Sequence, residues 1–309
     1  MVTVTRAIVI GGSGQIGGWL LRHLWDRGHE AVGTYATVPY PGLHPLQASD
    51  REAAARWLRD QRPDVVFYPA GFTFVDGCER DPEKARASNL EEPLNLARVA
   101  GDLGARFVYF STDYVFSGRD GPDDENAPPD PPNVYGRAKL EAERAIADLL
   151  GDRALIARTS WVYGPERQGK NFAYQVVRRL IGGEPVMVPS DQVSSPSYGP
   201  DVALAAVRLV EDGHSGLFHV AGPEVISRLE FARGIAVGFG LDPSPIGSKP
   251  TAELSQGAPR PLRGGLATSK LAQALPGLMR PLSSSLQDFL QRLEAGEGWS
   301  DPRVRPSGP

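Results

Sequence analysis

Residues 7–17 read AIVIGGSGQIG, an apolar run that leads directly into a glycine-rich turn. The glycines fit the pattern GxxGxxG through Gly11, Gly14 and Gly17, and they also fit GxGxxG if Gly12 is taken as the first. Both patterns provide a tight turn, bare backbone against a pyrophosphate, and a helix packed closely on a strand. An amphipathic segment follows at 19–27, and a helix there would direct free amide groups and the positive end of its dipole toward phosphates. The stretch therefore predicts a strand, a turn and a helix that bind a dinucleotide.

The same order of apolar run and helical segment recurs along the first half of the chain. Strand-like runs lie at 7–10, 31–35, 65–68, 107–111 and 154–160. Ser49 and Glu52 have the spacing of a capping box at the start of a helix that must end before Pro63. Gly28 and Gly104 stand where left-handed caps would end helices. This alternation predicts an α/β fold, a Rossmann-type doubly wound parallel sheet.

The second half of the chain is less regular, which suggests a second lobe. Proline and glycine are frequent at 120–132 and 242–265, although Ser227 and Glu230 form another capping box. We expect residues 1–165 to form the dinucleotide-binding domain, completed by about 199–222. Residues 166–297 would then form mainly a smaller, irregular substrate-binding lobe. Residues 298–309 have no apolar periodicity and are predicted to be a disordered tail.

Composition excludes several classes of protein. The 309 residues carry a formal net charge of −4, which gives no basic surface for nucleic acid. Cys78 is the single cysteine, so no internal disulfide can form, and a reducing, cytoplasmic location is expected. The five histidines lack HExxH spacing, and we expect no metal site. No apolar run is long enough for a membrane partner, and a homodimer is left open.

The segment after the second strand leaves the choice of cofactor open. An NAD site usually has a carboxylate here for the ribose 2′-hydroxyl, and an NADP site has an arginine for the 2′-phosphate. Residues 31–49 contain no aspartate, glutamate, lysine or arginine. Thr34, Tyr35 and Thr37 could hydrogen-bond either cofactor.

Tyr135 and Lys139 are the strongest candidates for catalysis. A spacing of four places both side chains on one face of the helix predicted at 133–150. A nearby ammonium would lower the pKa of the phenol, which would make Tyr135 a general acid for a ketone that receives hydride. Thr112 ends a strand at the expected crevice and could bond the same carbonyl oxygen. By itself a YxxxK spacing arises by chance, with the tyrosine packed and the lysine solvated, but the glycine turn and Thr112 favour the catalytic interpretation.

Several motifs in order resemble the extended short-chain dehydrogenase/reductases, and within them the dTDP-4-dehydrorhamnose reductase family. They are GGSGQIG at 11–17, TFVDGCE at 73–79, FSTDYVF at 110–116, NVYGRAKL at 133–140, RTSWVY at 158–163, Asn171-Phe172, Asp191-Gln192 and Arg260-Pro261. The sequence departs from the family pattern at 68–71 (YPAG), at Gln47, where an aspartate often contacts adenine, and at Ser194, where glycine is usual. A serine makes a left-handed backbone less accessible at that position.

The resemblance implies roles for individual residues. Thr112, Tyr135 and Lys139 would form the catalytic triad, and Lys139 would also bond the nicotinamide ribose. The residues implied to bind NADPH or NADH are Gly11, Gly14, Gln15, Ile16, Gly17, Thr34, Tyr35, Gln47, Ala70, Gly71, Tyr135 and Lys139. The residues implied to face a nucleotide-sugar substrate are Thr73, Tyr114, Trp161, Asn171 and Arg260, with the arginine as a cation for its diphosphate.

The resemblance implies NAD(P)H-dependent reduction of the 4-keto group of a nucleotide-activated deoxysugar. One alternative is a nucleotide-sugar epimerase, which uses the same three residues and keeps NAD tightly bound. Another is a non-catalytic regulatory subunit that is similar to that of methionine adenosyltransferase.

Overall fold

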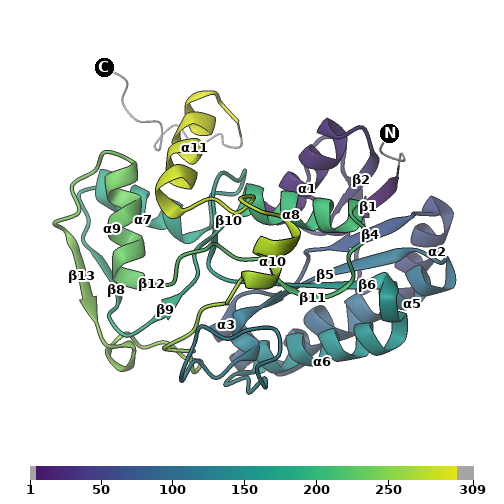
Figure 1. Ribbon diagram of the computed structural model, residues 1–309, viewed down its shortest axis with the longest axis horizontal. Coiled ribbons are helices and arrows are strands. Elements are labelled where there is room, and N and C mark those ends of the chain that lie inside the picture. Colours follow the sequence, from purple (N-terminus) through teal and green to yellow (C-terminus); the bar gives the residue numbers. More distant parts are fainter. Residues whose placement is uncertain (1–4, 298–309) are drawn as a thin grey trace.

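The computed structural model describes residues 5–297, and its centre is a seven-stranded parallel sheet (Figure 1). The strand order is β11-β6-β5-β4-β1-β2-β3. These strands are β1 (Arg6–Val9), β2 (Glu30–Tyr35), β3 (His44–Pro45), β4 (Val65–Tyr68), β5 (Arg106–Thr112), β6 (Ala154–Thr159) and β11 (Gly216–His219). The chain first builds outward from β1 through β2 and then returns to place β4 on the other side of β1. This reversal of direction confirms the doubly wound parallel sheet, whose crevice for a ligand lies at the carboxyl ends of the strands.

Successive residues of each strand point to opposite sides of the sheet, so apolar side chains lie on both faces and helices cover both. Val9, Phe67 and Val108 contribute to a core shared with α1 (Gln15–Asp26) and α8 (Gly199–Glu211). Ile8, Val66 and Phe107 contribute to the core on the other face, against α2 (Arg51–Gln61), α5 (Glu92–Asp102) and α6 (Val134–Leu150). Shorter elements join β4 to α5, namely α3 (Val75–Arg80), α4 (Pro82–Arg86) and a π-helix (Ala87–Glu91).

A second lobe packs beside the carboxyl ends of the strands and has its own core. Tyr174, Phe231 and Phe289 are fully buried in it. Its helices are α7 (Phe172–Ile181), α9 (Arg228–Gly238) and α11 (Leu282–Glu294). Its strands β8 (Val186–Pro189) and β13 (Ile246–Lys249) pair with each other. Short strands and a helix join the lobes: β7 (Val162–Tyr163), β10 (Ser197–Tyr198), β9 (Val193–Ser194), β12 (Ile226–Ser227) and α10 (Ser269–Ala274). The tail predicted at 298–309 lies outside the described residues.

Most local helix signals are confirmed, and one is wrong. Gly28 and Gly104 adopt φ of 82° and 74°, and Ser227 forms the complete capping box with Glu230. Asp50, rather than Ser49, caps α2, because its carboxylate accepts the Ala53 amide at 3.0 Å. A charged acceptor at the helix N-terminus also gains from the helix dipole, which a serine hydroxyl does not.

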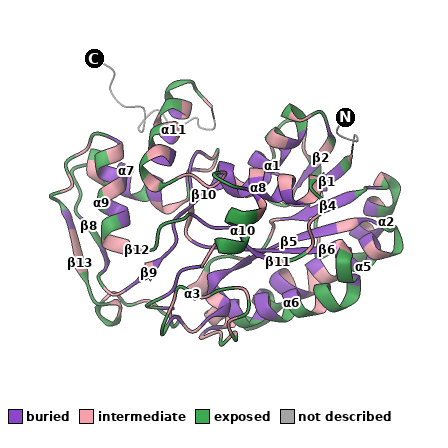
Figure 2. Cartoon of the chain, viewed as in Figure 1, coloured by how far each residue is buried: buried purple, intermediate pink, exposed green. Residues whose placement is uncertain are grey.

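Burial is concentrated in the strands, while the outer helix faces are exposed (Figure 2). Among the helices of residues 5–297, none combines the length and the apolar character needed to span a bilayer.

Candidate active site

The carboxyl ends of the central strands open onto a cleft of about 670 Å³. Its wall contains the glycine turn after β1, residues 69–71 after β4, the end of β5, the start of α6 and residues 159–162 after β6. Of the residues proposed from the sequence, it brings together Gly11, Gly14, Gln15, Ile16, Gly17, Ala70, Gly71, Thr73, Thr112, Tyr114, Tyr135, Lys139, Trp161 and Asn171. Segments up to 160 residues apart therefore converge on one cavity.

The glycine turn has the bare backbone that its sequence predicted. Gly11 has a φ of 93°, and a Cβ on Gly17 would lie 2.1 Å from the Gly11 carbonyl oxygen. The first turn of α1 contains no acidic residue, and its N-cap Gly14 has no side-chain cap. The amide groups at this helix start are thus available to an anion in the cleft.

Three residues proposed to bind the cofactor do not line the cleft. Thr34 is 1% exposed, and its hydroxyl accepts the Gly11 amide at 3.1 Å, so it braces the glycine turn from behind. Gln47 donates its side-chain amide to the Ala36 carbonyl at 2.7 Å and thereby holds the loop after β2. Tyr35 pairs with Pro45 between β2 and β3. The side chains of Thr34 and Gln47 therefore support the shape of the site rather than form its wall.

The start of α6 is held in place so that Tyr135 enters the cleft. Asn133 caps the helix by accepting the Gly136 amide at 2.8 Å, and its Nδ2 donates to the Pro259 carbonyl at 2.8 Å. Helix and sheet edge approach so closely that a Cβ on Gly136 would lie 2.1 Å from the Tyr114 carbonyl oxygen. The Tyr135 ring meets the Tyr114 ring edge-on at 5.9 Å. Glycine at 136 is therefore required by packing against residues 22 positions earlier.

The expectation that Lys139 lowers the pKa of Tyr135 is wrong for this structure. Burial raises the pKa of Tyr135 well above 10, and a hydrogen bond with the Thr112 side chain only partly opposes this effect. Desolvation disfavours the charged form of a buried phenol, and here it outweighs the favourable hydrogen bond from Thr112. Tyr135 is accordingly a protonated phenol at neutral pH, next to the hydroxyl of Thr112.

Lys139 is also shifted toward its neutral form. Burial lowers its pKa to about 7, while the charge of Glu143 acts in the opposite direction. The ammonium donates to the Phe110 carbonyl at 2.7 Å and lies 4.4 Å from the centre of the Tyr109 ring. Glu143 in turn binds Arg158 through both carboxylate oxygens, at 2.9 Å and 2.6 Å, in a pair that is almost completely buried. The spacing Tyr135, Lys139, Glu143 is a signal for this pair that the sequence interpretation missed.

Asp113 forms a buried cluster beside Thr112 that the sequence interpretation also missed. Its Oδ2 accepts the hydroxyls of Ser160 at 2.8 Å and Ser194 at 2.7 Å, and its Oδ1 accepts Thr112 at 3.3 Å. Burial raises the pKa of Asp113, and the three hydroxyl donors lower it. Ser194, which stands where the family usually has glycine, lies in β9 and uses its side chain to complete this cluster. The serine thus adds a hydrogen bond that a glycine cannot make.

The proposed substrate residues differ in how free their side chains are. Trp161 lines the cleft with a φ of 40°, a left-handed conformation that is strained for a non-glycine residue and typical of functional sites. Asn171 caps α7 and donates to the Gly164 carbonyl at 2.8 Å. Arg260 does not line this cleft, because its guanidinium binds Asp76 at 2.7 Å.

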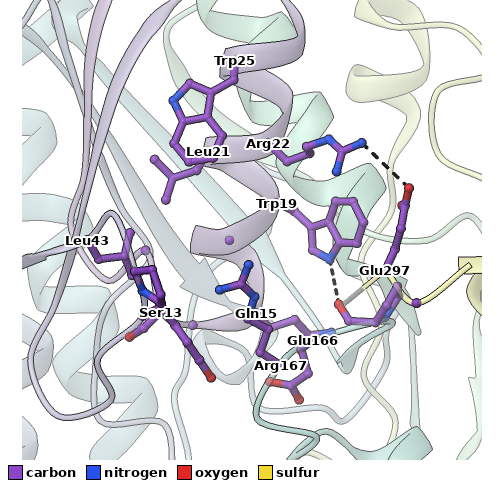
Figure 3. Close-up of a pocket in the computed structure, with 17 residues that line it drawn as sticks. Ser13, Gln15, Trp19, Leu21, Arg22, Trp25, Leu43, Glu166, Arg167 and Glu297 are labelled. Atoms are coloured by element: carbon purple, nitrogen blue, oxygen red, sulfur yellow. Dashed lines mark hydrogen bonds and ion pairs between the residues drawn. The ribbon is translucent and has the colours of Figure 1, made fainter. Parts of the chain in front are cut away.

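A second pocket of about 450 Å³ borders the other side of the glycine turn (Figure 3). Its wall includes Ser13, Tyr40 and Arg167, and the Arg167 guanidinium lies 5.0 Å from the centre of the Tyr40 ring. The loop that carries Arg167 is fastened to the turn, since Gln168 Nε2 donates to the Ser13 carbonyl at 2.8 Å. The Trp19 indole donates to the Pro165 carbonyl of the same loop at 2.7 Å.

Comparison with known proteins places the chain in a family. Residues 5–295 match the model described as the RmlD substrate binding domain. A probable low-salt glycan biosynthesis reductase of Haloferax volcanii is 37% identical, over 94% of this chain and 97% of that protein. A dTDP-4-dehydrorhamnose reductase of Mycolicibacterium smegmatis is 32% identical, over 93% and 85%. The crystal structure of dTDP-4-dehydrorhamnose reductase from Bacillus anthracis in complex with NADP matches with a TM-score of 0.85 and 26% identity, over 94% of this chain and 100% of that one. The chain therefore belongs to the RmlD substrate-binding-domain family, the family of the dTDP-4-dehydrorhamnose reductases.

Proposed function

We propose that this protein is a cytoplasmic oxidoreductase of the short-chain dehydrogenase/reductase type that reduces the 4-keto group of a nucleotide-activated deoxysugar with NADPH or NADH. The observation that carries the proposal is the position of Tyr135, Lys139 and Thr112 on the wall of the cleft that also contains the glycine turn. Membership in a family of dTDP-4-dehydrorhamnose reductases supports the substrate class.

The cleft has features that suit a dinucleotide. The bare turn at Gly11–Gly17 leaves room for a pyrophosphate at the start of α1. Three polar atoms on the cleft wall are buried without a hydrogen-bond partner among the described residues: Gln15 Nε2, Ser111 Oγ and Thr159 Oγ1. Buried polar atoms are rarely left unpaired, so these atoms favour a polar ligand in the cleft.

The residues at the cleft wall can perform the proton chemistry of a ketone reduction. The bound nicotinamide would supply the hydride to the carbonyl carbon. Tyr135 remains protonated at neutral pH and donates its proton to the carbonyl oxygen as negative charge develops there. Thr112 hydrogen-bonds the same oxygen, and Asp113 is already supplied with donors by Ser160 and Ser194, so the Thr112 hydroxyl is free to turn toward the substrate. A protonated Lys139 stabilises the phenolate that remains.

The pocket beside the glycine turn favours NADPH over NADH. No carboxylate lies between residues 31 and 48 to bind a free ribose 2′-hydroxyl. Arg167 is exposed above Tyr40, close to the Ser13 side of the turn, where a 2′-phosphate would be expected. Adenosine 2′,5′-bisphosphate should therefore bind more tightly than 5′-ADP in calorimetry, and Arg167→Gln should remove most of that difference. Equal affinities in the unmodified protein would contradict this preference.

The reaction is tested by following the absorbance of NADPH at about 340 nm with a dTDP-4-keto-6-deoxyhexose. Tyr135→Phe should lower kcat by about 10²- to 10⁴-fold, because the proton donor is lost. Its affinity for NADPH, measured by fluorescence titration, should change little. Tyr163→Phe is the matched control, because that hydroxyl bonds Ser285 in the core of the second lobe and does not face the cleft. If no nucleotide-linked keto sugar causes oxidation of NADPH, the proposal is refuted. Tightly bound NAD that stays with the protein through purification would favour an epimerase.

A further inference from the structure

Arg228 is a half-buried cation with an unusual environment. It is the first residue of α9, in the second lobe, which Figure 1 shows across the molecule from β2. Its guanidinium lies 4.3 Å from the centre of the Trp161 ring and 3.8 Å from the centre of the Phe172 ring. The guanidinium carbon therefore lies within cation–π range of two aromatic rings.

The guanidinium has no carboxylate partner among the described residues. Its Nη1 is buried without any hydrogen bond, and burial lowers the pKa of Arg228 to about 10. Asp113 is the acidic residue whose charge acts on it, but that carboxylate is already bound by Ser160 and Ser194. A buried polar atom without a hydrogen-bond partner is costly and uncommon, so the enclosed Nη1 favours a ligand at this position.

Other arginines of the molecule show how such charges are normally paired. Arg158 is more deeply buried than Arg228, and it binds both carboxylate oxygens of Glu143. Arg260, the arginine first expected to bind a diphosphate, is bound to Asp76 at 2.7 Å. Arg228 thus differs from both in having its charge available.

Arg228 lies directly behind the wall of the cleft. Trp161, on which it stacks, lines the cleft, and so does Tyr114. The positive charges of Arg260 and Arg228 both act to lower the pKa of Tyr114, although burial raises it overall to about 12. The residue as a whole is half-buried, although its Nη1 is enclosed.

We infer that Arg228 binds the diphosphate group of the nucleotide-sugar and so anchors the substrate while its ketone meets Tyr135. The inference rests on the proposed function, since it assigns a binding residue for that substrate class. A guanidinium anchored by cation–π contacts with two rings presents a fork of donors that matches two phosphate oxygens. Because Arg228 has no carboxylate partner among the described residues, a bound diphosphate would displace no other anion and would form an ion pair with the guanidinium.

The test compares dTDP with thymidine, which has the same base and sugar but no phosphate. In isothermal titration calorimetry, Arg228→Gln should weaken dTDP binding by about 10- to 100-fold and leave thymidine binding nearly unchanged. Arg228→Lys keeps the charge without the planar fork, so its affinity for dTDP should lie between those of the unmodified protein and Arg228→Gln. Arg233→Gln, an exposed arginine on the same helix, is the matched control and should bind dTDP like the unmodified protein.

The outcomes separate this inference from the proposed function. If the unmodified protein binds dTDP and Arg228→Gln binds it equally well, Arg228 is not the anchor. The same conclusion follows if only Arg260→Gln weakens dTDP relative to thymidine. If the unmodified protein binds neither ligand, the substrate is not linked to dTDP, and the proposed function fails for that nucleotide. NADPH affinity and the thermal midpoint should be retained in Arg228→Lys, which shows that any loss is specific to the diphosphate.

Discussion

Lys139 donates a hydrogen bond of 2.7 Å to the backbone carbonyl oxygen of Phe110. The bond joins the middle of a helix to the carboxyl end of a strand, and it holds the ammonium one helical turn from Tyr135. The same position removes the ammonium from water, which is why its pKa falls from 10.5 to about 7. The charge needed at the site is therefore retained only in part at neutral pH.

The activity should depend on the protonation of Lys139. The ammonium is present below its lowered pKa of about 7 and is lost as the pH rises through that value. The kcat/KM for NADPH, which reports the free enzyme, should fall over this range. Tyr135 does not titrate there, because its pKa is raised above 10. Lys139→Met should have low activity with no such decline, and a flat profile up to about pH 9 in the unmodified protein would contradict the assignment.

The glycine turn should tolerate no side chain at Gly17. A Cβ there would meet the Gly11 carbonyl oxygen at 2.1 Å, so Gly17→Ala should displace the turn and weaken NADPH binding by at least about tenfold. Gly18→Ala is the control, because its Cβ would be 3.7 Å from the nearest atom. That variant should bind NADPH normally and gain roughly 0.5–1 kcal/mol of stability from reduced chain entropy. Fluorescence titration and urea unfolding would measure the two effects, and equal affinities would count against the model of the turn.

Ser194 should stabilise the fold through its bond to the buried Asp113 carboxylate. Removal of the hydroxyl in Ser194→Ala should lower the free energy of unfolding by about 1.5–3 kcal/mol, as for hydrogen bonds to charged groups. Ser244 makes a similar bond to Asp242, but both residues are exposed. Ser244→Ala should therefore cost much less. Urea denaturation of both variants measures these two losses of stability. Equal losses would contradict the stabilising role of Ser194.

The buried pair of Glu143 and Arg158 should be sensitive to the loss of one partner. Glu143→Gln leaves the enclosed guanidinium without its counterion and should destabilise the protein by about 3–5 kcal/mol. Glu141, two residues earlier on α6, pairs with Arg86 at 2.7 Å, but both side chains are more than half exposed. Glu141→Gln should cost less than about 1 kcal/mol. Thermal unfolding of the two variants provides the comparison, and similar midpoints would contradict it.

Much of the first lobe could be predicted because its signals are local. A strand followed by glycines and an amphipathic segment encodes its own turn and helix, and Tyr135 and Lys139 share a helix face through their spacing alone. Prediction failed where a property of a residue depends on distant parts of the chain that pack around it. The pKa of Tyr135 depends on burial, and burial depends on how β5, α6 and the second lobe pack around the phenol. The capping of α2 by Asp50 rather than Ser49 turned on a competition between neighbouring acceptors.

The amino-acid order alone thus determined the doubly wound sheet, the glycine turn and the alignment of Tyr135 with Lys139, because each depends on contacts within a few residues or on a periodic pattern. Only the tertiary structure decided which polar groups lack a partner. Asp113 accepts a hydrogen bond from a serine 81 positions away, Arg260 pairs with Asp76, and Arg228 lies beside two aromatic rings with no carboxylate partner within residues 5–297. Pairing between such distant side chains depends on the packed backbone and carries no periodic signal in the sequence.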